Sequence, residues 1–325
     1  MSAREVVVLS GVRTAIGGYG GSLKGESPSS LAAACVREAV SRSGLAPDAV
    51  GHAVFGNVIH TERQDMYLAR VAAVNAGLPH ETPAFTLNRL CGSGLNAIVS
   101  ASQLVLLGDC DAAVAGGAEV MSRGQYWLPS ARFGQRMGDG QMVDAMVGAL
   151  TDPFDGIHMG VTAENVAEKW GISRDDQDAL AVESHNRAER AIDEGRFKDQ
   201  ILPIEMKSRK GTTVFDTDEH LRRGCSLADM AKLRPVFKQD GTVTAGNASG
   251  INDAAAALVL MDRSAAEAKG LSPMARMVGY SFAGVDPKYM GIGPVPAVKQ
   301  LLDKTGVSVG DIDVFEVNEA VAAQA

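Results

Sequence analysis

Residues 85–107 read FTLNRLCGSGLNAIVSASQLVLL, in which a short apolar stretch and a glycine-containing turn precede a long apolar segment. The pattern predicts a strand or extended turn up to Leu90 and a helix from Gly94 onward. The thiol of Cys91 therefore stands at a predicted corner between a strand and a helix. A strand followed closely by a helix is the repeating unit of α/β proteins.

Similar pairs of strand and helix occur elsewhere in the chain. Short apolar runs, which predict strands, alternate with longer segments that have helical character. The predicted strands include residues 6–9, 53–55 and 112–115, and the predicted helices include residues 29–43 and 94–107. This alternation predicts an α/β fold in which helices cover a sheet.

The segment of residues 121–250 breaks the alternation. It is rich in charge, glycine and methionine, and it holds one strongly helical block at residues 162–191. The apolar run at residues 254–261 then resumes the earlier pattern. We interpret the segment as a loop domain inserted into an α/β domain.

An internal repeat is visible when residues 33–44 are placed over residues 295–306. The two segments, AACVREAVSRSG and VPAVKQLLDKTG, match without a gap at basic and apolar positions and at the final glycine. Both predict a helix that ends at a glycine cap, followed at the same offset by strands around Val54 and Glu316. Amphipathic helices that end in glycine also produce such matches by chance. A true duplication would give two related halves, of which the second stops before any counterpart of Cys91.

The predicted fold is thus a pair of duplicated α/β halves with layered helices and sheets, a loop domain inserted in the first half and an incomplete second half. The last residues, 321–325, are interpreted as an unfinished helix without a capping residue. The predicted boundaries are 1–120 for the first half, 121–250 for the inserted domain, 251–272 for the return to the first half and 273–325 for the start of the second.

The overall composition argues against several classes of protein. The 325 residues are 46% hydrophobic and carry a formal net charge of −8, whereas nucleic-acid binding depends on basic faces. The apolar run near the N-terminus is too short for a signal peptide, and no window approaches the roughly 18 apolar residues of a membrane helix. The four cysteines stand far apart and show no metal-ligand spacing. We predict a cytoplasmic protein with no metal site and no nucleic-acid or membrane partner.

Cys91 is the strongest candidate for chemistry in the chain. At the start of a helix, unpaired backbone N–H groups and the positive end of the helix dipole favour a thiolate and can stabilise an oxyanion. The glycines that follow it let a substrate approach closely. A free cysteine is more often a small buried apolar residue, and we interpret Cys35, Cys110 and Cys225 in that way.

Five segments, taken together, resemble the thiolase family. Residues 88–94 (NRLCGSG) resemble its acyl-enzyme cysteine motif, and residues 156–165 (GIHMGVTAEN) resemble its loop-domain signature. Residues 241–253 (GTVTAGNASGIND) resemble its pantetheine-contact loop, residues 290–296 (MGIGPVP) the opening of its C-terminal half, and residues 317–320 (VNEA) its Asn-Glu-Ala motif. The segments follow the family's order over nearly the whole chain, which is similar to acetyl-CoA C-acetyltransferases, or biosynthetic β-ketothiolases.

The resemblance implies a role for ten residues. Cys91 would carry the acyl group, and Asn318 would orient a water in an oxyanion hole. The residues that match contacts to coenzyme A are His158 and Met159 at the pantetheine tunnel, Ser249 as a hydrogen-bonding partner of pantetheine with Ala245 beside it, Arg222 against the adenine nucleotide, and Leu233, Phe237 and Met290 as apolar contacts. Without the resemblance, we would interpret His158 as an ordinary loop residue, residues 246–250 as a turn and Arg222 as a solvated charge.

The implied reaction is acyl transfer between acyl-CoA molecules through a Cys91 acyl-enzyme. In one direction it is Claisen condensation of acetyl-CoA with an acyl-CoA to a β-ketoacyl-CoA, and in the other it is thiolysis. The resemblance implies coenzyme A and acyl-CoA as substrates, no permanently bound cofactor, and a homo-oligomer, either dimer or tetramer. The family's Gly-His-Pro and Cys-x-Gly-Gly-Gly loops, which supply the remaining acid and base groups, have no match in residues 1–325.

Two alternatives stay open at this point. One is a thiolase-like protein that binds acyl-CoA or lipid without turnover, and the other is a related cysteine-dependent condensing synthase. The long insertion with its His-Met-Gly sequence and the Asn-Glu-Ala motif favour a thiolase over a synthase. The presence of Cys91 favours an enzyme over a binding protein, while the two unmatched loops leave the activity of residues 1–325 alone undecided.

Overall fold

The computed structural model describes residues 4–209 and 211–325. Lys210, in the predicted inserted domain, and residues 1–3, in the predicted first half, lie outside the described residues. The chain divides into two compact units: the first holds residues up to 146 with 197–220 and 251–277, and the second holds residues 147–196, 221–250 and 278–325. Residues of the predicted inserted domain occur in both units, and its boundaries stay a prediction.

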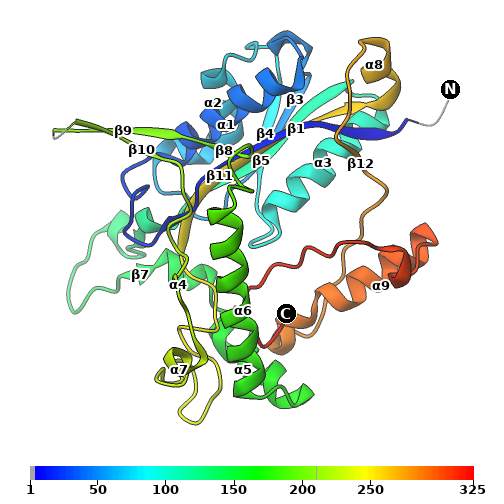
Figure 1. The fold of residues 1–325 in the computed structure, drawn as a ribbon. Coiled ribbons are helices and arrows are strands. Elements are labelled where there is room, and N and C mark those ends of the chain that lie inside the picture. Colours follow the sequence, from blue (N-terminus) through cyan, green and yellow to red (C-terminus); the bar gives the residue numbers. More distant parts are fainter. Residues whose placement is uncertain (1–3, 210) are drawn as a thin grey trace. The chain divides into compact units, whose positions relative to one another are not determined.

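The first unit is built on an eight-stranded sheet (Figure 1). Its main path has the order β12-β1-β11-β5-β3-β4, while β2 pairs with β11 and β8 pairs with β1. The strands are β1 (Val6–Thr14), β2 (Gly17–Gly18), β3 (His52–Gly56), β4 (Ala84–Leu87), β5 (Ala112–Val120), β8 (Ile201–Leu202), β11 (Asn252–Asp262) and β12 (Ala275–Arg276). β4, β3 and β5 run parallel, whereas β11 is antiparallel to both β1 and β5. The apolar runs that predict strands all lie in this sheet.

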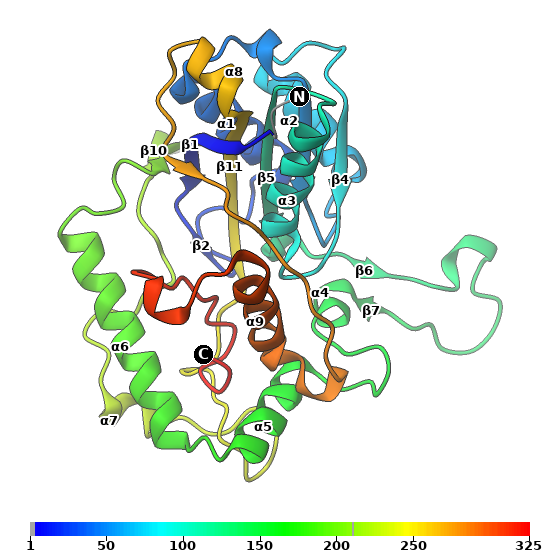
Figure 2. The ribbon, with the colours of Figure 1, turned by 90° about the vertical axis from the view of Figure 1, so that its right-hand side faces the viewer.

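Helices cover both faces of the sheet (Figure 2). They are α1 (Pro28–Ser43), α2 (Leu68–Ala76), α3 (Ser93–Leu107) and α8 (Arg263–Ala268). In β5, Val114 belongs to the core that contains α1 and α2, whereas its neighbour Ala115 belongs to the core that contains α3. Successive side chains of a strand point to opposite faces, so α3 lies on the face opposite α1 and α2. A strand buried on both faces is apolar at every position, as the run at residues 112–115 is.

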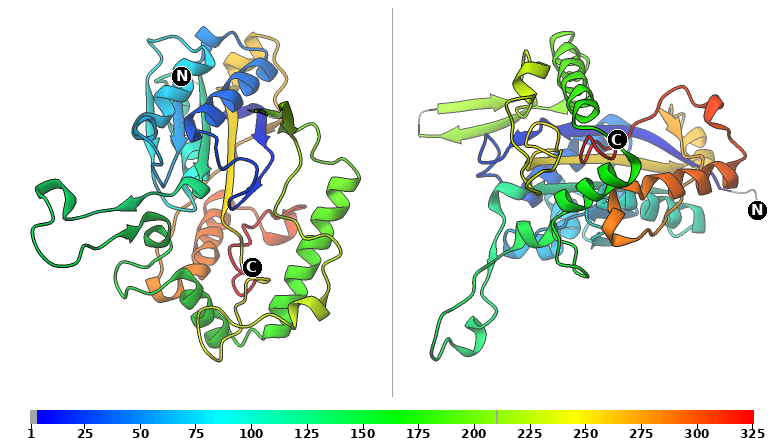
Figure 3. Two further views of the ribbon diagram at one scale, coloured as in Figure 1. Left: turned by 90° about the vertical axis from the view of Figure 1, so that its left-hand side faces the viewer. Right: turned by 90° about the horizontal axis from the view of Figure 1, so that it is seen from below.

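Two hairpins and several short helices form the connections of the first unit. β6 (Tyr126–Trp127) pairs with β7 (Val143–Asp144), and β9 (Ile204–Ser208) pairs with β10 (Gly211–Phe215). Figure 3 shows both hairpins reaching away from the large sheet. The 3-10 helices are η1 (Pro47–Ala49), η2 (Arg63–Tyr67), η3 (Met121–Arg123) and η4 (Ala131–Phe133), and the short α4 (Ala145–Ala149) follows β7.

The second unit is mainly helical in its described residues. It contains α5 (Met159–Trp170), α6 (Arg174–Asp193), α7 (Leu227–Met230), η5 (Pro287–Ile292), α9 (Pro294–Thr305) and η6 (Val309–Asp311). A small core joins α5 to the loop of residues 241–250 and to the end of the chain through buried Ala163, Val243 and Ala323. This core positions the segments that carry most of the candidate site.

The helical block predicted at residues 162–191 consists of two helices. It is divided into α5 and α6, because Gly171 adopts a left-handed conformation (φ 66°) that ends α5 and Ser173 then caps α6. Ser173 Oγ accepts from the Asp176 N–H while the Asp176 carboxylate accepts from the Ser173 N–H, which is a capping box. α5 also begins earlier than the predicted start near Thr162, since His158 is its N-cap.

The two helices that the internal repeat predicts are confirmed, but the strand predicted after the second helix is not. α1 and α9 both end at a left-handed glycine, Gly44 (φ 76°) and Gly306 (φ 71°). The strand predicted around Glu316 is wrong, because residues 312–320 contain no strand. Apolar Val314 and Phe315 in this segment are 80% and 54% exposed, so no neighbouring strand covers them in the described part of the chain.

Residues 321–325 form a turn rather than the predicted unfinished helix. The N–H groups of Gln324 and Ala325 both donate to Val321 O, at 3.1 and 3.3 Å. Val321 itself forms an antiparallel bridge with Ala248, which ties the turn to the loop of residues 241–250. Contacts with that loop thus decide the conformation of this segment.

One helical stretch is longer and more apolar than expected. The window Leu90–Leu107, which consists of α3 and the three residues before it, spans 18 residues with a mean hydropathy of 1.5. The expectation that no segment approaches a membrane span in length and composition is therefore wrong. Within the first unit, α3 packs against β3 and β5. A core helix of a soluble protein satisfies the same criteria, so the stretch is weak evidence for a membrane span.

Candidate active site

Cys91 lies in the turn between β4 and α3, and side-chain hydrogen bonds hold this turn. Asn88 Oδ1 accepts from the Leu90 N–H at 2.8 Å, and Ser93 Oγ accepts from the Arg89 N–H at 2.8 Å. Ser93 Oγ also donates to Leu90 O at 2.7 Å. Leu90 has a φ of 45°, a left-handed conformation that is uncommon outside glycine. The residue before Cys91 therefore carries backbone strain that the local hydrogen bonds offset.

Two glycines of the sheet allow α3 to begin close to the strands. A Cβ placed on Gly56, the last residue of β3, would lie 2.7 Å from Ser93 Cβ, and a Cβ on Gly117 of β5 would lie 3.7 Å from Gly94 Cα. Close approach of backbone is a common reason for glycine inside a strand. The first turn of α3 therefore rests directly on β3 and β5, which sets the position of Cys91 relative to the sheet.

The four cysteines differ in accessibility. Cys91 is exposed, Cys35 is buried, and Cys110 and Cys225 are half-buried. Burial raises the pKa of Cys35 to about 12, and burial together with two neighbouring aspartates raises the pKa of Cys110 to about 11. Burial also raises the pKa of Cys225. Because the thiolate is the reactive form, these three thiols suit an inert role, and Cys91 is the accessible candidate.

A polar network beside this corner was missed by the sequence analysis. Glu119, near the end of β5, accepts from the N–H groups of Val58 and Ile59 at 2.9 Å each. It also accepts from Asn57 Nδ2 at 3.1 Å, and the Asn57 N–H donates to Leu87 O at the end of β4. The only signal in the sequence is a charged residue near the end of an otherwise apolar run.

In the second unit, His158 and Met159 are located at the start of α5. His158 is the N-cap, and its Nδ1 accepts from the Gly160 N–H at 3.0 Å. Its ring stacks on Phe237, with 4.8 Å between centroids and 16° between planes. A Cβ on Gly160 would meet the Phe237 ring at 2.2 Å, so this stack requires a glycine there. Burial lowers the pKa of His158, and an accepting Nδ1 also requires the neutral ring.

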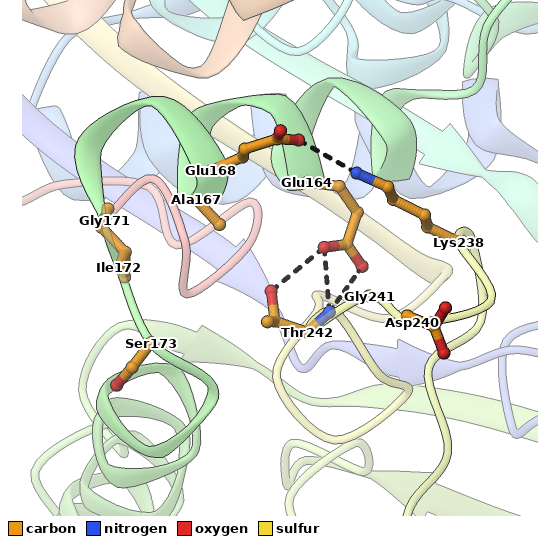
Figure 4. A pocket seen from close by; sticks show the side chains of 10 residues that line it. All are labelled: Glu164, Ala167, Glu168, Gly171, Ile172, Ser173, Lys238, Asp240, Gly241 and Thr242. Atoms are coloured by element: carbon orange, nitrogen blue, oxygen red, sulfur yellow. Dashed lines mark hydrogen bonds and ion pairs between the residues drawn. The ribbon is translucent and has the colours of Figure 1, made fainter.

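A buried glutamate of α5 holds the loop of residues 241–250. Glu164 is 4% exposed, and its carboxylate accepts from the N–H groups of Thr242 and Val243 at 2.9 and 2.8 Å. It also accepts from Thr242 Oγ1 at 3.1 Å. Figure 4 shows Glu164 and Thr242 facing each other in a pocket between α5 and the loop. None of the ten assigned residues lines this pocket.

Asn247 is a second buried anchor of the same loop. It is 3% exposed, its Oδ1 accepts from the Thr244 N–H at 2.7 Å, and its Nδ2 donates to Asp178 Oδ1 at 2.9 Å. Its carbonyl accepts from the Ala322 N–H at 2.8 Å. Glu164 and Asn247 lie inside residues 156–165 and 241–253, but the sequence alone predicts only a turn at residues 246–250 and no role for either residue.

Ser249 and Asn318 lie on two segments that hydrogen-bond to each other. The Ser249 N–H donates to Ala320 O at 3.0 Å. The side chains of Ser249 and Asn318 are both exposed. The backbone thus brings the loop of residues 241–250 and the Asn-Glu-Ala motif together, and leaves a hydroxyl and an amide exposed.

The other assigned residues fall into two groups. Leu233 packs on the loop, since a Cβ on Gly246 would lie 2.5 Å from Leu233 Cδ1, and Ala245 is exposed on the same loop. Met290, which is 39% exposed, belongs to η5, and the exposed Arg222 precedes α7. Met290 and Arg222 therefore stand on separate elements of the second unit, to which every assigned residue except Cys91 belongs.

An exposed thiol at a strand-to-helix corner of an α/β sheet defines a candidate enzyme with a cysteine nucleophile. The model of the thiolase N-terminal domain matches residues 6–264, and that of the thiolase C-terminal domain matches residues 271–325. The beta-ketothiolase BktB of Cupriavidus necator is 64% identical over 99% of this chain and 82% of its own length. The acetyl-CoA acetyltransferase of Syntrophomonas wolfei is 48% identical over 99% of this chain and 81% of its own length. The chain belongs to the thiolase family.

Solved structures show the same fold. The acetyl-CoA acetyltransferase of Bacillus anthracis aligns with a TM-score of 0.96 at 46% identity, covering 99% of this chain and 82% of its own. Human mitochondrial 3-ketoacyl-CoA thiolase aligns with a TM-score of 0.96 at 42% identity, covering 100% of this chain and 82% of its own. The predicted thiolase fold and the prediction of a thiolase-type acyltransferase are confirmed.

Proposed function

We propose that Cys91 carries the acyl group in the thiolase reaction of this protein. Its Sγ bonds to the carbonyl carbon of an acyl-CoA, the carbon–sulfur bond to coenzyme A breaks, and coenzyme A leaves as the thiol. A second acyl-CoA, deprotonated at its α-carbon, then attacks the acyl-enzyme and releases Cys91 with a β-ketoacyl-CoA. Thiolysis is the reverse. The observation that carries this proposal is the exposed Cys91 thiol at the first turn of α3.

We further propose that the second unit binds the coenzyme A portion of the substrate. The stacked rings of His158 and Phe237 form an apolar wall that suits a pantetheine chain, and the exposed Ser249 hydroxyl can bond its amides. The Arg222 guanidinium suits a phosphate of the nucleotide. Human mitochondrial 3-ketoacyl-CoA thiolase, solved in complex with CoA, aligns with this chain at 41% identity and a TM-score of 0.94.

The remaining assignments complete this proposal. Asn318 orients a water for an oxyanion hole, and Met159, Leu233, Ala245 and Met290 add contacts to coenzyme A. Acetyl-CoA is a substrate, which the names of several relatives support, and coenzyme A enters and leaves as substrate rather than as a resident cofactor.

We also propose a cytoplasmic homo-oligomer, either dimer or tetramer. Phe133 and Met137, in the excursion between β6 and β7, are 91% and 94% exposed. Large apolar side chains that are fully exposed are often covered in an assembly. Sedimentation of the purified protein tests this proposal, and a monomer at all concentrations would contradict it.

The Cys91 assignment is tested by trapping the acyl-enzyme. We expect the protein incubated with acetyl-CoA and quenched in acid to gain the mass of one acetyl group, on the peptide that contains Cys91. The Cys91→Ala variant should show no adduct, whereas Cys225→Ala, which removes a half-buried thiol, should show the same adduct as the unaltered protein. An adduct that persists in Cys91→Ala would refute the assignment.

A further inference from the structure

The turn that follows β3 is the structural support of the Cys91 corner. Residues 57–59 continue directly from Gly56, and a Cβ on Gly56 would lie 2.8 Å from the carbonyl carbon of Ser93 in the first turn of α3. Because β3 and α3 are in direct backbone contact there, a displacement of this turn displaces the start of α3. The Cys91 thiol would move with it.

Glu119 holds this turn. Its carboxylate accepts three hydrogen bonds, from the N–H groups of Val58 and Ile59 and from Asn57 Nδ2, at distances between 2.9 and 3.1 Å. Asn57 is 1% exposed and also donates to Ala118 O at 2.9 Å, so the turn is joined to β5 by two residues of that strand. Two of the three donors are backbone N–H groups, which have no freedom to turn toward another acceptor.

We propose that Glu119 is a positioning residue for Cys91, which sets the reactivity of the thiol by fixing the turn of residues 57–59 against the first turn of α3. The proposal rests on the role proposed for Cys91. The physical reason is that misplacing a reacting atom by about 1 Å can lower the rate of the reaction roughly 100-fold. Glu119 acts through the backbone, so substrate binding to the second unit is not affected.

The charge of Glu119 gives this arrangement a pH dependence. Burial raises the pKa of Glu119 to about 7, against the opposing effect of the bonds from Ile59 and Val58, and Asp65 contributes to the rise. Asp65 in η2 is the charged group whose effect reaches Glu119, and Glu119 pairs in the ladder with Ala254, the neighbour of Asp253 in β11. The ionised carboxylate accepts the three bonds most strongly, because protonation makes one oxygen an O–H donor and leaves it a weaker acceptor.

Two buried oxygens next to Glu119 bear on the protonated form. Asn57 Oδ1 and Asp65 Oδ1 are buried and have no hydrogen-bond partner among the described residues. An acceptor without a partner in a buried place is uncommon. Asn57 belongs to the turn that Glu119 holds, and Asp65, in η2, acts on the pKa of Glu119. Protonation of Glu119 therefore changes the number of donors and acceptors beside these two oxygens.

The test compares two glutamates that hold loops in the same way. Glu119→Gln replaces one acceptor oxygen by an amide that faces an N–H donor. Glu219→Gln is the matched control, since Glu219 accepts from the Gly18 N–H, the Ser22 N–H and Ser22 Oγ, in a loop of the first unit that does not carry the nucleophile. Thiolysis of acetoacetyl-CoA is measured for both, together with thermal unfolding.

We expect Glu119→Gln to lower kcat by roughly 10- to 100-fold with little change in KM, because geometry at Cys91 is altered while substrate binding is not. Glu219→Gln should retain the kcat of the unaltered protein. A kcat for Glu119→Gln equal to that of Glu219→Gln would overturn the proposal. An unchanged acetyl adduct on Cys91 in the same experiment would show that the role of Cys91 stands independently.

A second measurement uses the reactivity of the thiol and needs no substrate. The rate of Cys91 alkylation by iodoacetamide, followed by peptide mass, should show a step near pH 7 in the unaltered protein, with faster reaction above it as Glu119 ionises. This step should vanish in Glu119→Gln. If that variant does not fold, Asn57→Ser, which removes one of the three donors but leaves the carboxylate, should lower the amplitude of the step. A pH profile without any such step in the unaltered protein would overturn the proposal.

Discussion

The corner around Cys91 and the loop of residues 241–250 are both irregular backbone, but they are held by different means. At the corner, α3 rests on β3 and β5, and glycines such as Gly56 remove the side chains that would separate them. In the loop, the buried side chains of Glu164 and Asn247 supply acceptors for backbone N–H groups. The conformation of the corner requires that glycine have no Cβ, whereas the conformation of the loop requires the side-chain oxygens of Glu164 and Asn247.

The comparison implies that the two regions fail in response to different substitutions. At the corner, an added methyl group should be the most damaging change, since close-packed backbone cannot give way without moving an element. In the loop, loss of an acceptor should matter most, because a buried N–H without a partner is costly.

Gly56→Ala should damage the corner most. The new Cβ would lie 2.7 Å from Ser93 Cβ, so α3 must shift. We expect a loss of about 1–3 kcal/mol in the free energy of unfolding and a loss of up to roughly 100-fold in the rate of Cys91 acetylation. Urea unfolding and rapid-quench mass spectrometry measure the two effects. Gly25→Ala is the control, because no atom lies within 4 Å of its added Cβ; equal effects of the two changes would contradict the prediction.

Glu164→Gln should release the loop of residues 241–250. The Thr242 N–H donates to both carboxylate oxygens, so the NH2 group of the amide must face at least this N–H. Loss of an acceptor in a buried place should cost about 1–3 kcal/mol, and we expect weaker binding of coenzyme A. Glu168→Gln, one turn later in α5, removes only an ion pair with Lys238 in which the Glu168 side chain is 73% exposed, and should change stability by at most about 1 kcal/mol. Calorimetric titration with coenzyme A and urea unfolding provide the readouts. The loop is not held as described if Glu164→Gln binds coenzyme A like the unaltered protein.

His158 should make the second unit sensitive to acid. Its folded pKa lies below the ordinary value of 6.5, so the neutral ring is favoured in the folded state and its contribution to stability is present above pH 6.5. That contribution is lost as pH falls through the folded pKa, when protonated Nδ1 can no longer accept from the Gly160 N–H. His158→Asn keeps an N-cap acceptor but cannot titrate. As pH is lowered from 7, the free energy of unfolding should fall more steeply for the unaltered protein than for His158→Asn. Parallel curves for the two proteins would count against this role for His158.

Leu90→Gly should have the smallest effect. A left-handed conformation costs a non-glycine residue about 1–2 kcal/mol, and glycine relieves that strain. Glycine also loses more conformational entropy on folding, which costs about 0.5–1 kcal/mol of stability. We therefore expect the free energy of unfolding to rise by no more than about 1 kcal/mol. Urea unfolding checks the sign. A clear loss of stability would mean that contacts of the Leu90 side chain outweigh the strain at its backbone.

Local patterns were sufficient for most of the sheet and for several helix ends. The strands at residues 6–9, 53–55, 112–115 and 254–261 were predicted because a strand buried on both faces is apolar throughout. The ends of α1 and α9 were predicted because a glycine can take the left-handed conformation of a helix cap. The same rule, applied to Gly171, would have divided the block at residues 162–191 into two helices, but charged and apolar residues continue across it with helical spacing.

The errors arise where one segment depends on another. Residues around Glu316 are apolar enough for a strand, but a strand needs a partner, and none of the described residues pairs with them. Residues 321–325 have helical composition but instead form a turn tied to Ala248. The network of Glu119 with Asn57 joins residues far apart in the chain, so no local pattern could indicate it.

The amino-acid sequence alone determines the α/β class, the accessible corner at Cys91 and the family. These follow from periodicity, glycine positions and short motifs, each of which involves only a few neighbouring residues. The conformation of the loop of residues 241–250, the stack of His158 on Phe237 and the hold of Glu119 on the turn after β3 appear only on folding. They depend on hydrogen bonds and packing between distant residues, whose strength is set by burial. Burial is a property of the folded chain and of no single segment.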